Sequence, residues 1–364
     1  MTEGAARNEG HGTTPRIATL GRDTKLSIRW IAAAMAAGAV ALAQGASAQV
    51  QAASGLGPPA ATHCPRACMT QAMDQYLDAL VRHDPSGLPL SNGVRFTENT
   101  EEIHVGEGLW IGASEGPSTF KVYAVDPSSS QVVFYGVMKE RGRPIQIAIR
   151  LKLVNGRITE IEHVINRSFS AAALPNMVAP RLALLADVPA AERTPRAAMV
   201  NAADDYFEAI EHQDGSRAPF APDCDRRENG SKTTNNHPPV AWPAPLGSPE
   251  ADRGMAVIGS MGCAEQLNTG VMAFITRLWP RRIDVVDEEK GLAVTFVMFN
   301  HRGGTGDLPI KGVEGVTHLP LGGGASTMQM MEMFKIRGGQ IHEVEAIGFQ
   351  LPYGAKSGWE AYGQ

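Results

Sequence analysis

Hydrophobic positions change their spacing along the chain, and the change occurs twice. Residues 69–81 and 199–210 place apolar side chains three and four positions apart, which predicts an amphipathic helix in each stretch. Residues 132–138 and 293–299 are rich in β-branched and aromatic side chains, and residues 145–153 alternate apolar with polar ones. These patterns predict strands, with a half-buried strand at 145–153.

Turn signals follow the later strands. Asn155-Gly156 and Gly338-Gly339 favour tight hairpin turns, and each leads into a further β-rich run, at 158–165 and at 341–349. In each half of the chain, helices therefore come first and an antiparallel curved sheet follows. We predict two tandem domains of the α+β class.

The two halves also share residues at fixed offsets. Ten residues of the first half recur 130 positions later: Met69, Ala72, Asp74, Tyr76, Ala79, Asp84, Ser86, Pro89, Glu98 and Asn99. The match continues downstream at larger offsets, so the second copy carries insertions. A repeat of this length is a whole domain rather than a solenoid unit. The chain is therefore read as a tandem duplication.

The N-terminal residues differ from the rest. Lys25 and Arg29 precede an apolar run at 31–43, and Ala46-Ser47-Ala48 follows it. This order is typical of a cleaved secretory signal, and the run is short for a membrane span. The alternatives are a single membrane anchor or a start assigned too far upstream. We expect a secreted or periplasmic protein with no stable membrane span after cleavage.

Shifts in composition divide the chain further. The second copy has a Pro/Gly/Asn-rich loop that the first lacks, and long loops of this kind are often lids or binding loops. The expected parts are a signal peptide at 1–48, a flexible leader at 49–62, a first domain at 63–168, a linker at 169–198 and a second domain at 199–364 with an inserted loop at 231–261.

Charge and motifs exclude several function classes. A formal net charge of −5 without Lys/Arg clusters argues against nucleic-acid binding. The chain has no Gly-rich phosphate loop and no nucleophile elbow. Its histidines show no metal-like spacing, so we expect no metal and no cofactor.

Four cysteines follow the expected cleavage site, where an oxidising compartment permits disulfides. Cys224 and Cys263 both lie in the second copy, and we expect them to join its insertion to its body. Cys64 and Cys68 are four residues apart and would pair only with some local distortion. Four cysteines allow three pairings, so the sequence leaves the connectivity open.

The segments Tyr76-x-x-Ala79-Leu80-x-x-x-Asp84 and Tyr206-x-x-Ala209-Ile210-x-x-x-Asp214 resemble the first helix of ketosteroid isomerase. The run from Phe220 to Glu228 resembles the segment that carries that enzyme's catalytic aspartate. The layout looks like the SnoaL-like branch of the nuclear-transport-factor-2-like superfamily. That resemblance implies two cone-shaped domains, each with helices packed on a curved antiparallel sheet around a pocket.

The resemblance also implies roles for particular residues. It puts the hydrogen-bonding tyrosine at Tyr76 and Tyr206, and the general base at Glu98 and Glu228, with Glu in place of Asp. The alternative for the tyrosines is an ordinary helix-face aromatic whose hydroxyl reaches a buried partner. The alternative for Glu98-Asn99 and Glu228-Asn229 is a loop organised by side-chain-to-backbone hydrogen bonds.

A third role, a protonated acid that donates to an oxyanion, falls by resemblance on Ile149 and Glu332. On residues 328–336, Lys335 and Arg337 mark the odd-numbered face as solvated. The even-numbered face, with Met328, Met330, Glu332, Phe334 and Ile336, is then buried. A buried carboxyl needs a partner, a proton or a function. The alternative is a salt bridge to Arg277, Arg281 or Arg282. Glu160, Glu162, Glu343 and Glu345 are placed on a solvated face.

Two function classes follow. The first is a cofactor-independent acid/base enzyme, an isomerase, dehydratase or lyase, acting on a hydrophobic cyclic or aromatic small molecule in the second domain. Its expected catalytic residues are Glu228, Tyr206 and Glu332, and its expected binding residues are Asn229, Met328, Met330, Phe334, Tyr76 and Glu98. The second class is a non-catalytic secreted binder of an apolar ligand. In both, we expect the two cones to pack as an intramolecular pseudo-dimer, with homo-oligomerisation left open.

Overall fold

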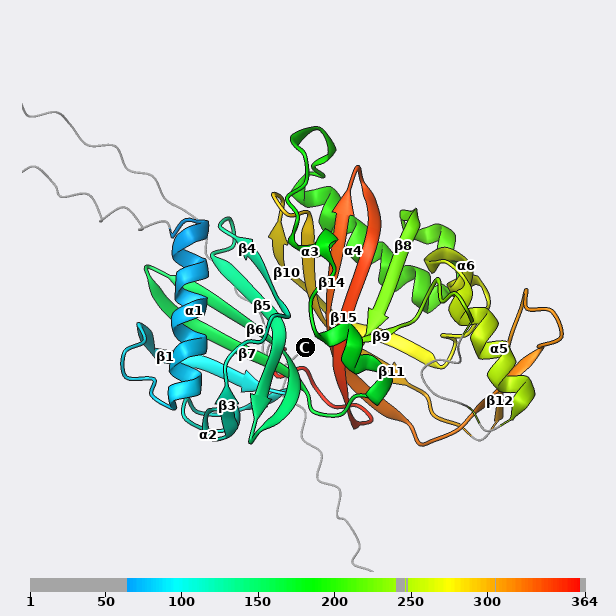
Figure 1. Ribbon diagram of the computed structural model, residues 1–364, viewed down its shortest axis with the longest axis horizontal. Coiled ribbons are helices and arrows are strands. Elements are labelled where there is room, and N and C mark those ends of the chain that lie inside the picture. The colour runs from blue at the N-terminus through cyan, green and yellow to red at the C-terminus, as the bar shows by residue number, and fades with distance from the viewer. Residues whose placement is uncertain (1–63, 240–245, 247, 305, 361–364) are drawn as a thin grey trace, which may run out of the picture. The chain divides into compact units, whose positions relative to one another are not determined.

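The computed structural model describes residues 64–239, 246, 248–304 and 306–360 (Figure 1). The expected signal peptide and leader lie outside the described residues, as does part of the expected inserted loop, at 240–245 and 247.

The first copy lays one long helix, α1 (Arg66–Arg82), across a sheet (Figure 1). The sheet runs in the order β2-β1-β7-β6-β5-β3, and β4 also pairs with β5. A four-residue helix, α2 (Leu109–Gly112), follows the first two strands. The strands are β1 (Leu90–Glu98), β2 (Glu101–Glu102), β3 (Ala113–Glu115), β4 (Lys121–Asp126), β5 (Gln131–Glu140), β6 (Arg143–Val154) and β7 (Arg157–Asn166).

The second copy repeats this plan around α4 (Arg196–His212). Its main sheet runs β10-β11-β14-β15-β8-β9, and β12 and β13 form a separate two-stranded ribbon. The strands are β8 (Phe220–Glu228), β9 (Ser231–Lys232), β10 (Ile275–Asp287), β11 (Leu292–His301), β12 (Gly306–Pro309), β13 (His318–Leu321), β14 (Ser326–Arg337) and β15 (Gln340–Pro352). The predicted α+β class with two repeated domains is confirmed.

One strand pair in each sheet differs from the expected antiparallel pattern. Strand β1 runs parallel to β7, and its counterpart β8 runs parallel to β15, whereas the other neighbours in these sheets are antiparallel. The parallel pair arises because the strand after the long helix joins the sheet beside the last strand of its copy. This pairing brings Glu98 next to His163 and Glu228 next to Ala346.

The two long helices end alike, which explains part of the repeated sequence. His83 and Gln213 adopt left-handed backbone conformations, with φ of 57° and 53°, and close the helices with backbone hydrogen bonds. Asp84 and Asp214 then each accept a hydrogen bond from the backbone N–H two residues later, at 3.0 Å. The repeated Asp-x-Ser therefore builds a turn.

The inserted region contains a helix that the sequence analysis described as loop. Ser248 caps helix α5 (Pro249–Ser260), and its side chain accepts a hydrogen bond from the backbone N–H of Ala251. Pro249 and Glu250 complete a favourable first turn, so the signals for a helix start were present. A second helix, α6 (Cys263–Asn268), follows directly.

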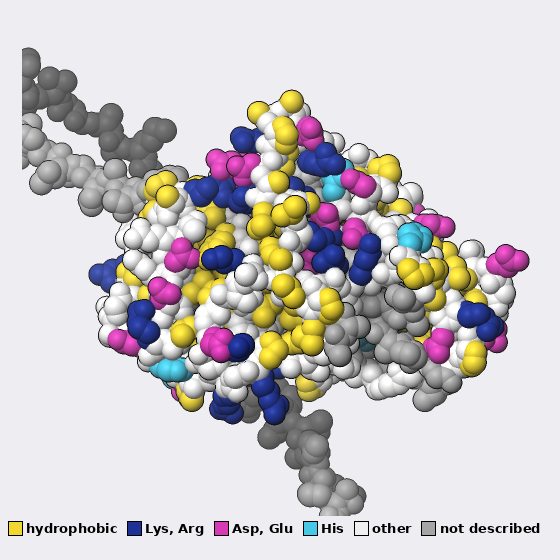
Figure 2. Space-filling view, viewed as in Figure 1, with side chains coloured by type: hydrophobic (Ala, Val, Ile, Leu, Met, Phe, Trp, Pro, Cys, Tyr) yellow, Lys and Arg dark blue, Asp and Glu magenta, His cyan; other side chains and the backbone are white. Residues whose placement is uncertain are grey.

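The expected linker carries short helical turns: η1 (Ala171–Met177), α3 (Leu182–Leu185) and η2 (Ala190–Glu192). Leu174, Val178 and Leu182 expose their side chains there. Figure 2 shows hydrophobic side chains along the middle of the face on which this segment lies.

The prediction of a solvated odd-numbered face on residues 328–336 is wrong. Met331 and Met333 are fully buried and join a hydrophobic cluster that also contains Tyr135 and Val164 of the first copy. Lys335 is buried as well, and its ammonium donates hydrogen bonds to the backbone carbonyls of Ala186 and Lys290. Both faces of this strand are therefore buried, one inside its own domain and one against the first copy.

Two of the four glutamates that were predicted to face solvent, Glu162 and Glu345, are also buried. Glu162 is buried against Arg150 and Arg282, and Glu345 is buried against Arg181. Arg282 belongs to the second copy and Glu162 to the first, so this ion pair joins the two sheets.

Contacts between the copies come in reciprocal pairs. Arg66 of the first copy pairs with Asp287 of the second, and its counterpart Arg196 pairs with Asp126 of the first. Asp287 also accepts from the Val125 backbone N–H at 2.9 Å, and Asp126 from the Val286 N–H at 3.0 Å. Residues equivalent in the repeat thus exchange the same contacts, as in a two-fold symmetric interface.

Candidate functional site

A pocket of about 310 Å³ lies in the second domain. Its walls are mostly apolar, and three ionisable side chains, Arg226, Glu228 and His301, are also in the lining. The other lining residues are Ile210, Leu246, Met255, Val271, Met272, Phe274, Ile275, Phe299, Leu308, Leu319, Pro320, Leu321, Met328 and Met330. The volume and lining suit a small, largely apolar molecule with few polar groups.

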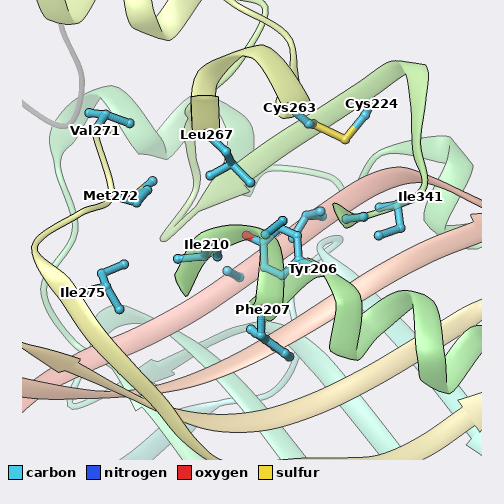
Figure 3. Close-up of a cluster of buried hydrophobic side chains, with 14 of the residues drawn as sticks. Tyr206, Phe207, Ile210, Cys224, Cys263, Leu267, Val271, Met272, Ile275 and Ile341 are labelled. Atoms are coloured by element: carbon cyan, nitrogen blue, oxygen red, sulfur yellow. A yellow bond between two sulfur atoms is a disulfide. The ribbon is translucent and has the colours of Figure 1, made fainter. Parts of the chain in front are cut away.

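Several elements place these residues. Strand β8 puts Arg226 and Glu228 two positions apart, so both side chains leave the same face of the sheet. Met328 and Met330 come from β14, and Met255 comes from the inserted helix α5. Figure 3 shows Ile210, Val271, Met272 and Ile275 among the surrounding hydrophobic cluster.

Arg226 is buried and held by neutral partners. Its Nε donates to the Tyr206 hydroxyl at 3.1 Å, and its Nη1 donates to Gln266 Oε1 at 2.8 Å. Gln266 is fixed in turn, because its Nε2 donates to the Thr233 and Ile258 carbonyls. The guanidinium is thus positioned before any ligand binds, and its charge is not cancelled by these partners.

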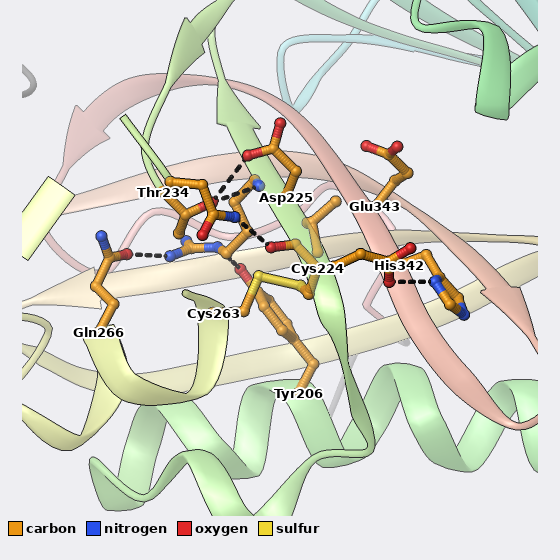
Figure 4. The surroundings of a disulfide bond; sticks show 12 residues. Tyr206, Cys224, Asp225, Thr234, Cys263, Gln266, His342 and Glu343 are labelled. Carbon is orange, nitrogen blue, oxygen red and sulfur yellow. Dashed lines mark hydrogen bonds and ion pairs between the residues drawn. A yellow bond between two sulfur atoms is a disulfide. The ribbon is translucent and has the colours of Figure 1, made fainter. Parts of the chain in front are cut away.

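A disulfide joins the elements that carry this network. Cys224 on β8 is bonded to Cys263 at the start of α6, the helix that carries Gln266 (Figures 3 and 4). Cys64 and Cys68 form the other disulfide, with their Cα atoms 5.4 Å apart. No metal-binding group of three His, Cys, Asp or Glu side chains occurs within the described part of the chain.

Glu228 lies on the pocket wall beside Arg226. Burial raises the pKa of the Glu228 carboxyl, and the positive charge of Arg226 lowers it by a smaller amount. A carboxyl with a raised pKa holds and releases protons nearer to neutral pH than an exposed glutamate does. Glu228 is therefore suited to acid/base chemistry on a molecule in the pocket.

Glu332 lies behind the wall rather than on it. It pairs across strands with Ala346, which pairs with Glu228, so the two carboxyls occupy one row of the sheet. Burial raises the pKa of Glu332 to about 8, against the lowering effect of Arg226 and with a further rise from Glu228. Its Oε2 has no hydrogen-bond partner among the described residues.

Two of the three arginines that were expected as possible salt-bridge partners of Glu332 form ion pairs with other residues instead. Arg281 pairs with Asp204, Glu208 and Glu211, while Arg282 pairs with Glu162 and Asp284.

Tyr206 is also behind the wall. Its ring packs edge-on against Phe334, with the ring centroids 4.9 Å apart, and both side chains belong to the core cluster. Burial raises the pKa of the Tyr206 hydroxyl far above its ordinary range. Tyr206 therefore stays protonated and acts as a hydrogen-bond partner of Arg226.

Asn229 stabilises a turn. Its backbone is left-handed, with φ of 48°, and its Oδ1 accepts from the Gly348 N–H at 2.9 Å. Asn99 does the same in the first copy, accepting from the Ile165 N–H at 2.7 Å. These bonds match the loop-organising alternative for the Asn of each Glu-Asn pair.

In the first domain the corresponding groups, Tyr76 and Glu98, lie on either side of the buried His163. The Tyr76 hydroxyl lies 2.9 Å from His163 Nε2, and His163 Nδ1 lies 3.5 Å from Glu98 Oε2. Glu98 also accepts from the Leu109 N–H at the start of α2, and the ring of Trp110 packs against Tyr76. Helix α2 thus contacts Glu98, whereas its counterpart Glu228 borders the pocket in the second domain.

Hydrogen bonds also set the charge of Glu98. Burial raises the pKa of Glu98, but bonds from His163, Leu109 and Arg167 outweigh it and leave the pKa below its usual value. Glu98 and its counterpart Glu228 therefore have opposite pKa shifts.

Sequence reasoning missed Arg226 and His301. Arg226 had a usable signal, because its counterpart in the repeat is Phe96, a core residue of the first domain. His301 had none beyond its residue type, since the sequence does not show that the end of β11 borders a pocket.

These features define a class of protein: a tandem, cone-like α+β chain with an apolar pocket in its second domain. Within the described residues, no helix is both long and apolar enough to cross a membrane. The chain belongs to the family described as domain of unknown function DUF8021, which matches residues 62–165 and 192–348. The two matched stretches follow the two copies of the repeat.

Solved structures provide more distant similarities. A protein of unknown function with a cystatin-like fold from Methylobium petroleophilum PM1 is 14% identical, with a TM-score of 0.24, over 47% of this chain and 84% of that one. AclR, a proposed hydroxylase from Streptomyces galilaeus, is 14% identical, with a TM-score of 0.21, over 42% of this chain and 80% of that one. No curated protein matches the chain.

Proposed function

We propose that the second domain catalyses a cofactor-independent proton transfer on a small, hydrophobic cyclic or aromatic molecule. The observation that carries this proposal is a carboxyl with a raised pKa, Glu228, on the wall of an apolar pocket beside a buried guanidinium, Arg226. Isomerisation, dehydration and retro-aldol cleavage all begin with such a proton transfer. The SnoaL-like resemblance of the sequence supports the same reaction classes.

In the proposed reaction, ionised Glu228 removes a proton, from the carbon next to a carbonyl group in isomerisation and dehydration or from a hydroxyl in retro-aldol cleavage. Negative charge then develops on the carbonyl oxygen, and Arg226 donates a hydrogen bond to it. Tyr206 and Gln266 act as positioning residues, since they hold the guanidinium in place. This differs from the roles implied by the resemblance, in which the tyrosine and the second acid contact the oxyanion directly.

The first domain serves as scaffold in this proposal, and the two cones pack as a pseudo-dimer. Its Tyr76 bonds to His163, and Glu98 lies 3.5 Å from the same imidazole and accepts from the Leu109 N–H of α2. We further propose export of the chain to an oxidising compartment. The two disulfides are compatible with an extracellular or periplasmic location, and the sequence pattern of a signal peptide supports it.

Hydrogen–deuterium exchange tests the proton transfer without knowledge of the natural substrate. Cyclic and aryl ketones are incubated with the protein in D₂O, and loss of the α-proton signal is followed by NMR. We expect wild-type protein to accelerate exchange of at least one ketone, and Glu228→Gln to reduce that rate by about 10² or more. Glu101→Gln, an exposed change of the same type, is the control.

Equal exchange in wild type, Glu228→Gln and buffer would reject the proposed catalysis. If ketones bind under these conditions without exchange, the second candidate function, a non-catalytic binder, is favoured. The position of Tyr206 and Glu332 behind the pocket wall is the observation that supports this alternative.

A further inference from the structure

Among the described residues that line the pocket, His301 is the one ionisable residue that the proposed reaction leaves without a role. It ends β11 and lines the pocket with Arg226 and Glu228. Its ring packs edge-on against Phe274, with the centroids 5.1 Å apart, and its Nδ1 lies 3.5 Å from the Ser326 hydroxyl. One face of the imidazole is thus fixed by protein contacts while the residue still borders the cavity.

Strand register places His301 at the opposite end of the pocket from Glu228. Glu228 lies in the cross-strand row of Ala346, Glu332 and Thr295. His301 follows Thr295 by six positions on β11 and pairs with Ser326. Six residues of strand span roughly 20 Å before the curvature of the sheet shortens the path. The polar groups of the pocket therefore form two separate ends.

The wall between these ends is apolar. Met328 and Met330 of β14 lie along it, and Leu308 and Leu319 of the β12–β13 ribbon contribute from another element. A ligand that fills this space must be apolar in its middle, because a polar group there would lose its hydrogen bonds to water without replacement. Polar groups are tolerated where Arg226 or His301 can meet them.

We infer that the pocket selects an elongated apolar molecule with an oxygen at each end, and that His301 is the specificity-determining residue for the oxygen remote from Arg226. A carbonyl oxygen accepts from the Arg226 guanidinium at the reacting end. A hydroxyl or a second carbonyl bonds to the imidazole at the other end. This inference rests on the pocket assigned in the proposed function, but it concerns binding rather than proton transfer.

The charge state of His301 suits this role. Burial lowers the pKa of the imidazole below its usual value, so the ring is neutral at physiological pH. A neutral imidazole has one donor and one acceptor nitrogen and can therefore pair with either a hydroxyl or a carbonyl.

A matched pair of rigid ketones tests the inference by calorimetry. The compounds are 4-acetyl-4′-hydroxybiphenyl and its 4′-methyl analogue, which share the acetyl end and differ only at the remote end. We expect wild type to bind the hydroxyl compound about tenfold more tightly, which corresponds to one good hydrogen bond. His301→Phe should remove this preference and leave the affinity for the methyl compound within about twofold.

Two further variants test which end of the ligand meets Arg226 and provide a control outside the pocket. Arg226→Met should weaken both compounds by a similar factor, because the acetyl oxygen is common to them. His342→Phe alters a histidine that pairs with exposed Asp223, outside the pocket lining, and should keep the preference. Binding of both compounds by each variant at the concentrations used verifies that the pocket is folded.

The inference is overturned by any of three results: no binding of either ketone to wild type, no preference in wild type, or an unchanged preference in His301→Phe. The proposed catalysis fails separately. If Glu228→Gln leaves proton exchange unchanged but the hydroxyl preference depends on His301, the inference stands and the catalytic proposal falls.

Discussion

Position 226 illustrates how a single residue changes the interior of a cone. The first copy has Phe96 there, fully buried among core side chains, and the second copy has Arg226. An unpaired guanidinium in an apolar interior is costly, so its neighbours must compensate. Tyr206 and Gln266 supply hydrogen bonds, while ionised Glu228 supplies negative potential.

The protonation of Glu332 should be visible in the pH dependence of stability. Because the folded-state pKa of about 8 lies above the ordinary value of 4.5, the folded protein binds a proton that the unfolded chain releases. We expect the free energy of unfolding to fall as pH rises from about 5 to about 8, by roughly a few kcal/mol. Glu332→Gln should flatten this dependence in urea titrations.

An exposed change, Glu101→Gln, should leave the slope as in wild type. An identical pH dependence in wild type and Glu332→Gln would show that Glu332 is not the group responsible.

The sequence predicts burial correctly for Glu332 and wrongly for Lys335 and Glu345. The period-two pattern placed Glu332 on the inner face of its strand, and it is buried there. The same pattern assigned Lys335 and Glu345 to solvent, because a lone domain would expose that face. The first copy and the linker cover that face: Tyr135 and Arg181 donate to Glu345, and Lys335 donates to the Ala186 carbonyl. A single-strand pattern carries no information about a partner sheet.

At the scale of elements, the long helices and the main strands follow from periodicity, whereas the inserted region does not. Helix α5 has a capping residue and a proline at its start, but its Gly and Pro neighbours suggested a loop. The pocket depends on this helix and on the disulfide beside it, so the least predictable part of the second domain shapes the candidate site.

The two disulfides provide a matched comparison. Removing Cys224–Cys263, which are 39 residues apart, should cost about 4 kcal/mol of unfolding free energy, and removing Cys64–Cys68, four residues apart, about 2 kcal/mol. Paired Cys→Ala variants measured by urea unfolding test this order. Loss of the longer bridge should also weaken ketone binding, since α6 carries Gln266 to Arg226. A larger loss from the short bridge would contradict the entropic account.

For the whole molecule, the reciprocal ion pairs between the two copies should contribute to the free energy of unfolding. Asp126→Ala and Asp287→Ala each remove a buried carboxylate that accepts from an arginine and a backbone N–H of the other copy. We expect each to lower the free energy of unfolding by about 2–4 kcal/mol. Asp223→Ala, at an exposed ion pair, should cost less than about 1 kcal/mol.

Chemical denaturation followed by tryptophan fluorescence and circular dichroism gives these values. If Asp126→Ala lowers stability but Asp287→Ala does not, the two halves of the interface are not equivalent in energy, whatever their geometry.

The exchange of contacts between Arg66, Asp287, Arg196 and Asp126 bears on how the two cones came to differ. In an assembly of identical subunits, every substitution is made twice, so a guanidinium at the Phe96 position would enter both interiors. Joining the copies in one polypeptide keeps the mutual docking while each half mutates alone. The buried guanidinium of Arg226 is then carried by one cone alone, and the other keeps Phe96 at that position.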